Sequence, residues 1–91
     1  MAGRLKVEVV AVEERVWKGE AEMLIARTTE GELGVLPGHA PLLGQLAHPG
    51  QVRIKLEGGK EVGYEVNGGF LSVTGEGVTV LAESATPLAN K

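Results

Sequence analysis

The sequence predicts an all-β domain, a flattened antiparallel β-sandwich or barrel of short strands. Apolar and polar residues alternate with a period of two in several segments, 14 glycines separate these segments, and no segment has a sustained apolar stripe of helical period. Successive side chains of a strand point to opposite faces, so this alternation indicates strands with one buried face. The chain has 91 residues, which fits one small domain with a thin core.

The first predicted strands come from two segments near the N-terminus. The segment LKVEVVAV, residues 5–12, places Leu5, Val7 and Val9 on one face, and EMLIART gives a further strand that ends near Thr28. Between them stands Trp17, the only tryptophan of the chain. A large amphipathic ring of this kind is expected to cap one end of the core, with contact to a partner as the lesser alternative.

The second half of the chain predicts two hairpins. QVRIKLE (51–57) and EVGYEV (61–66) both alternate, and the GGK between them is typical of a hairpin turn. FLSVT (70–74) and VTVLAES (78–84) form another pair around the turn GEG. The final segment SATPLANK is interpreted as a linker or frayed end.

Composition excludes several classes of function. A net charge of −3 without a basic patch argues against a nucleic-acid binder. The chain has no cysteine, which excludes a disulfide framework and thiolate metal sites and permits an intracellular compartment. The N-terminus lacks the apolar run of a signal peptide, and no stretch approaches the roughly 20 apolar residues of a membrane span.

The stretch EGELGVLPGHAPLL, residues 30–43, has neither strand nor helix period and is therefore predicted to be irregular. Its prolines stiffen the backbone, and its apolar side chains are dense for a loop. A preorganised loop with apolar and acidic groups suits docking to a partner, because a loop that is already ordered loses little conformational entropy on binding. Leu42 and Leu43 follow Pro41 directly, so one is expected to anchor in the sandwich while the other faces a partner. The sequence does not decide which.

Chemical alternatives are weaker. The glycines of GELGVLPGH lack the lysine of a phosphate-binding loop, and GEGVTV lacks the third glycine of a dinucleotide site. A small hydrolase or metal-binding β domain would use His39, Glu30 and Glu32, although their spacing is not that of metal ligands. A carbohydrate- or peptide-binding sandwich is disfavoured because aromatic residues make up only 3% of the chain.

EGELGVLPGHAPLL closely resembles the signature of the epsilon subunit of bacterial F-type ATP synthases, which is called delta in mitochondria. VWKGEA, GQVRI, NGGFLSV and VTVLAESA follow in the order and spacing of that family, so the resemblance covers nearly the whole chain. It implies a flattened sandwich of about ten short strands over residues 1–86, with 87–91 as a C-terminal tail that begins a helical region.

The resemblance also implies a function. Epsilon subunits are non-catalytic rotor subunits of the central stalk, which bind the gamma subunit and the membrane-embedded c ring and couple proton flow to ATP synthesis. We therefore expect no enzymatic activity and no cofactor. A monomer is expected in isolation, and at work a peripheral location on the cytoplasmic face of the bacterial cell membrane, reached only through the complex.

Two sets of contact residues follow from the family. The expected c-ring contact consists of Glu30, Gly31, Glu32 and Leu33, whose acids would oppose basic loops of the ring. The expected gamma contact consists of His39, Ala40, Pro41, Leu42, Leu43 and Gln45. Typical members continue into two C-terminal helices that inhibit ATP hydrolysis and in some members bind ATP. Residues 1–91 do not include a match to those helices, so neither property is carried over to them.

Overall fold

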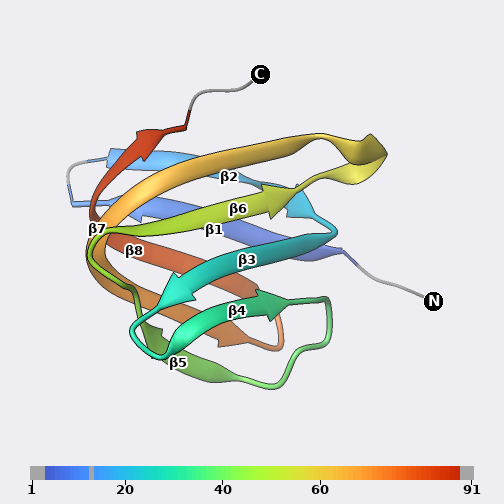
Figure 1. Cartoon of the computed structure of the whole chain (residues 1–91). Helices are drawn as coiled ribbons and strands as arrows, with labels where there is room; N and C mark the ends of the chain where they lie inside the picture. The colour runs from blue at the N-terminus through green and yellow to red at the C-terminus, as the bar shows by residue number, and fades with distance from the viewer. Residues whose placement is uncertain (1–3, 13, 89–91) are drawn as a thin grey trace.

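Eight strands form one hydrogen-bonded sheet that folds over into two layers, in a computed structural model that describes residues 4–12 and 14–88 (Figure 1). A single short 3-10 turn, η1, follows β6 in the described part of the chain. The elements are β1 (Leu5–Ala11), β2 (Glu14–Ala21), β3 (Met23–Thr28), β4 (Gly31–Val35), β5 (Leu42–Gln45), β6 (Gly50–Lys55), η1 (Glu57–Gly59), β7 (Glu61–Thr74) and β8 (Gly77–Pro87).

The two longest strands, β7 and β8, run through both layers, and Figure 1 shows the strong bend of β7. The first part of β7 pairs with β6, and its second part pairs with β5. The bend falls at Gly68 and Gly69, whose φ angles of +71° and +114° favour glycine. The backbone also passes close here, since a Cβ on Gly69 would lie 2.0 Å from the carbonyl oxygen of Leu81.

Strand pairing defines the two layers. The β5 layer consists of β2, β1, the start of β8, the end of β7, and β5. The β4 layer consists of the end of β8, the start of β7, β6, β3 and β4. Counting the two halves of β7 and β8 separately turns eight strands into ten segments, which reconciles the structure with the expected number of about ten.

The predicted all-β sandwich is confirmed, with one difference in strand direction. Six of the seven strand pairings are antiparallel, as expected, but β1 pairs with β8 in parallel. The alternation within each strand carries no information on its neighbour's direction. The alternation of apolar and polar residues therefore could not predict that the first strand pairs with the last one.

The core lies between the layers and includes the three residues predicted to share one face of β1. Leu5, Val7 and Val9 of β1 are at most 4% exposed, and Val52 and Ile54 of β6 are fully buried. No polar or charged residue is buried within the described part of the chain. The buried set is Leu5, Val7, Val9, Ala21, Leu24, Ala26, Val35, Leu46, Val52, Ile54, Tyr64, Val66, Leu71, Val73, Val78, Val80 and Ala82.

Trp17 caps an edge of the sandwich, as predicted. It lies on the edge strand β2 opposite Val9, is half-buried against the core, and covers Gly19, where a Cβ would approach the indole ring to 2.8 Å. The register between β1 and β2 shifts beside it, so that Val16 is an extra residue in the ladder. This bulge interrupts the period of two, which explains why β2 was not predicted as a strand.

Two predictions about irregular segments were wrong. Residues 31–35 form strand β4, in which Leu33 and Val35 point inward in alternation, while Gly31 and Gly34 hide the period of two. Residues 84–87 belong to β8, and beyond them the Leu88 amide donates to the Gly63 carbonyl at 2.9 Å. The predicted tail therefore begins as sandwich, and its residues 89–91 lie outside the described part of the chain.

Candidate partner-binding face

The expected ring contact forms the tight turn between β3 and β4. The Thr28 hydroxyl donates to the carbonyl of Gly31 at 2.7 Å and accepts from the amide of Glu30 at 3.1 Å. Gly31 has a φ of +123°, which glycine alone adopts readily. Glu30 and Glu32 are both exposed, whereas Leu33 packs partly against the core.

The expected gamma contact begins in the loop before β5. His39 is held locally, because its amide donates to the carbonyl of Leu36 at 3.0 Å and its Nδ1 lies 2.7 Å from the carbonyl oxygen of Ala40. Pro41 is exposed and leads directly into β5. This loop is the part of the 30–43 stretch that is irregular, as predicted.

The structure decides between the two leucines of β5. Leu42 points inward and packs against the core, whereas Leu43 is 72% exposed on the outer face. Leu42 pairs with Val73 and Leu43 with Ser72 on β7, so the strand register fixes this orientation. Leu43 is therefore the residue that can contact a partner without unfolding the domain.

The expected ring contact and the β5 part of the expected gamma contact border the same groove, whereas His39, Ala40 and Pro41 do not line it. β4 and β5 each lie at one free edge of their layer, and a groove of about 480 Å³ lies between them. The amide of Thr29 donates to the carbonyl of Gln45 at 2.9 Å, which holds the acidic turn against the end of β5. The groove is lined by Thr28, Thr29, Glu30, Gly31, Glu32, Leu33, Leu42, Leu43, Gly44 and Gln45.

An exposed apolar stripe crosses the outer face of the β5 layer. Leu43 on β5, Phe70 on β7 and Leu81 on β8 are 72%, 51% and 49% exposed. Phe70 and Leu81 are direct cross-strand neighbours, and a shallow recess of about 440 Å³ lies among the three side chains with Ser72 and Thr79. We call Leu43, Phe70 and Leu81 the apolar stripe. Clustered exposed apolar side chains of this kind mark interaction surfaces.

Sequence reasoning found Leu43 but missed Phe70 and Leu81. Both stand at the outward positions of their strands, where the alternation otherwise places polar residues such as Ser72 and Thr79. An apolar residue in the polar phase of a strand is a signal that could have identified them. Their assembly with Leu43 required the pairing of β5 with β7.

The outer face of the β4 layer has a different character. Arg53 Nε donates to Glu61 Oε2 at 2.9 Å across β6 and β7. This hydrogen bond and the charge of Glu61 raise the pKa of the Arg53 guanidinium, and the charge of Glu32 adds to the effect. Both side chains of this pair are exposed to solvent. An exposed ion pair contributes little stability and is typical of a solvated surface.

No metal centre is formed from the residues of the alternative hypothesis. His39 precedes β5 and the Glu30 turn abuts the other end of that strand. Over residues 4–12 and 14–88, no three His, Cys, Asp or Glu side chains gather closely enough to hold a metal ion. The same residues contain no helix with the length and hydropathy needed to cross a bilayer.

The fold defines a β-sandwich domain with an exposed apolar stripe on one face. The family model described as "ATP synthase, Delta/Epsilon chain, beta-sandwich domain" matches residues 4–88. The chain therefore belongs to the delta/epsilon chain family of ATP synthases, which confirms the resemblance seen in the sequence.

Individual relatives support the same family assignment. The ATP synthase epsilon chain of Frankia casuarinae is 57% identical over 81 residues, which cover 89% of this chain and 94% of that protein. The epsilon chain of Mycobacterium tuberculosis (strain ATCC 25618 / H37Rv) is 54% identical over 81 residues, 89% of this chain and 67% of its own length.

Solved structures share the fold. A chain in the Euglena gracilis mitochondrial ATP synthase, in a structure of OSCP, F1 and the c-ring, superposes with a TM-score of 0.86 at 30% identity. The match covers 92% of this chain and 53% of that one, so this chain spans about half its length. A chain from the central stalk and c-ring structure of the Tetrahymena thermophila enzyme has a TM-score of 0.75 at 15% identity, with 93% and 67% covered, and supports the fold alone.

Proposed function

We propose that this chain is a non-catalytic rotor subunit of the central stalk, which binds the gamma subunit and the c ring and couples proton flow to ATP synthesis. The observation that carries the proposal is the apolar stripe of Leu43, Phe70 and Leu81, exposed on one outer face of a delta/epsilon-family sandwich. The subunit reaches the cytoplasmic face of the membrane through these partners.

The gamma subunit occupies the apolar stripe in this proposal. Leu43 belongs to the contact segment expected from the sequence, and Phe70 and Leu81 extend that segment across two further strands. Covering these side chains removes apolar area from water, which is the main driving force of protein association. A rigid sheet presents them already ordered, so binding loses little conformational entropy.

The c ring occupies the acidic end of the groove in this proposal. Glu30 and Glu32 are exposed beside the groove, and Gly31 shapes the turn that presents them. Basic ring loops of the kind expected from the family are electrostatically complementary to these carboxylates. Contacts of this kind at the rim of an interface add modest affinity and are weakened by salt.

Binding to purified gamma subunit tests the proposal. The wild-type protein should bind gamma at micromolar concentration in calorimetry, and Phe70→Asp should weaken binding at least about tenfold, because a buried aromatic side chain contributes about 1.5–3 kcal/mol. Ile25→Asp is the matched control, since Ile25 is a half-buried outward residue of the β4 layer. Equal binding by Phe70→Asp and wild type would refute the assignment of this face.

A further inference from the structure

The end of β8 forms a free edge of the β4 layer. Residues 84–87 pair with β7 on one side, and no other strand of the described chain pairs with them on the other. Such an edge can fray or pair with another chain. Pro87 lies on this edge opposite Tyr64 and, as a proline, offers no amide to an added strand. Beyond it the amide of Leu88 donates to the Gly63 carbonyl at 2.9 Å, which adds a last hydrogen bond between β8 and β7.

The Leu88 side chain occupies the space that Gly63 leaves open. A Cβ on Gly63 would lie 2.9 Å from Leu88 Cδ1 and 3.6 Å from its Cβ and Cγ, so the leucine lies directly over this glycine. Leu88 is half-buried, whereas the two residues before it are exposed. Val62 and Tyr64, on either side of Gly63, pack against or within the core. The contact therefore lies on the outer face of the β4 layer.

The room needed by Leu88 explains the glycine at position 63. Gly63 does not have the positive φ angle of the glycines at the bend of β7, so its backbone conformation does not require glycine. Glycine in the interior of a strand lowers stability, because it loses more entropy on folding and has no side chain to pack. Trp17 covers Gly19 in the same way on the edge strand β2. At two free edges, an apolar side chain is thus seated over a glycine.

We propose that Leu88 and Gly63 form a latch that holds the end of β8 on the β4 layer and fixes the side of the sandwich on which the chain passes Leu88. The apolar stripe lies on the outer face of the other layer, and Figure 1 shows the end of β8 far from β5. The latched end of β8 and a partner on the stripe therefore do not compete for surface. Opening of the latch lets the last residues of β8 fray and makes the edge of β7 beneath them available.

Hydrogen exchange at the amide of residue 88 tests the latch. Gly63→Val fills the space over β7, and Leu88→Ala removes the side chain that occupies it. Each should speed exchange of this amide about fourfold to tenfold after correction for intrinsic rates, the effect of half the burial of one leucine. The matched control is Glu65→Val at the next outward position of β7, opposite Thr86, which should change the rate less than about twofold.

The double variant Gly63→Val with Leu88→Ala tests whether the two positions act through each other. It returns side-chain volume to the space over β7, so it should melt about 4 °C or more above the value obtained by adding the two single shifts. Additive shifts, or unchanged exchange of residue 88 in both single variants, would overturn the latch. Neither measurement involves gamma, so a failure of the proposed function and a failure of the latch are seen separately.

Discussion

Leu42 and Leu43 provide the sharpest test, because adjacent residues should have opposite effects. Leu43 is 72% exposed, so a docked partner can remove about three-quarters of a leucine side chain from water. Full burial contributes about 1.5–3 kcal/mol, so this share amounts to about 1–2 kcal/mol, or about 5- to 30-fold in affinity. Leu43→Ala should lose that amount of binding free energy. Leu43→Asp should lose more, because docking of the partner would also remove the new carboxylate from water.

Leu42→Asp should act on stability. Leu42 packs against the core from β5, and losing a core leucine costs about 2 kcal/mol even at the low end of the measured range. For a domain of this size each kcal/mol lowers the melting temperature by about 4–8 °C, so a fall of about 10 °C is expected. Leu43→Asp should melt close to the wild type, since its side chain already faces solvent.

Two measurements separate these effects. Calorimetric titration with gamma subunit reports affinity, and thermal melts followed by the fluorescence of Trp17, the only tryptophan, report stability. The reasoning is refuted if Leu43→Asp binds gamma like the wild type, or if Leu43→Asp rather than Leu42→Asp lowers the melting temperature.

Four further outcomes are expected. Glu32→Lys should partly uncouple proton flow from ATP synthesis in reconstituted enzyme, more at low salt, and full coupling there would contradict the ring contact. Gly69→Ala should lower the melting temperature by about 10 °C or more through backbone strain and collision, whereas Gly75→Ala, with open space around it, should not. Burial raises the pKa of Tyr64, so the unfolded chain loses the phenol proton first, and stability should fall above about pH 10, less so in Tyr64→Phe. His39→Gln should keep gamma binding within about threefold, because its ring contacts its own loop; a larger loss would show a direct role.

The strands that were predicted are those whose alternation is uninterrupted. In β1 and β6 every second residue is apolar and buried, so the sequence alone identifies both the strand and its inward face. β2 and β4 were missed for local reasons, a bulge at Val16 in the first and glycines at positions 31 and 34 in the second. The alternation of apolar and polar residues reflects which side chains of a strand are buried. A bulge or a glycine interrupts that alternation, so the strand can no longer be identified from it.

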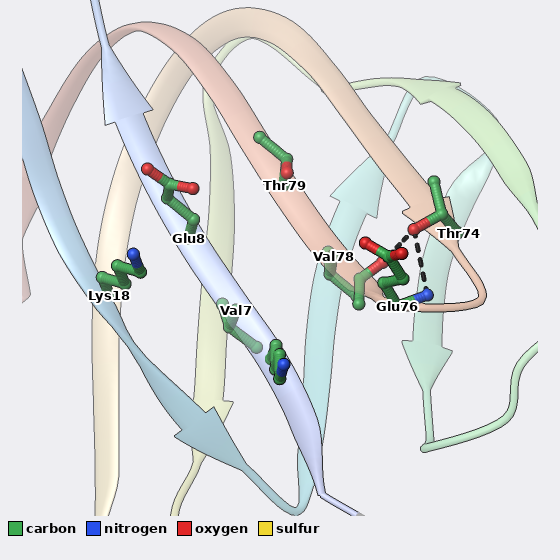
Figure 2. Close-up of a pocket in the computed structure, with 9 residues that line it drawn as sticks. Val7, Glu8, Lys18, Thr74, Glu76, Val78 and Thr79 are labelled. Carbon is green, nitrogen blue, oxygen red and sulfur yellow. Dashed lines mark hydrogen bonds between the residues drawn. The ribbon is translucent and has the colours of Figure 1, made fainter.

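The candidate site was predicted only in part, because it is assembled by long-range pairing. The segments around Glu30 and Leu43 were identified from sequence, but not that they border one groove. The positions of Phe70 and Leu81 beside Leu43 depend on β5 pairing with β7 and β7 with β8. The recess between β1, β2 and the turn from β7 to β8 (Figure 2) depends on the parallel pairing of β1 with β8, for which the alternation gave no indication.

That parallel pairing has a consequence for the order in which the protein can fold. β1 has two strand neighbours, β2 and β8, so the β1–β2 hairpin at the start of the sandwich pairs with the rest of the sheet only through β8, its last strand. During synthesis, the edge of β1 that pairs with β8 stays unpaired until residues 77–82 have left the ribosome. Contacts so far apart in sequence slow folding, and an open apolar hairpin is prone to associate with other chains. Completion of β8 is therefore the step that closes the sheet and ends this exposure.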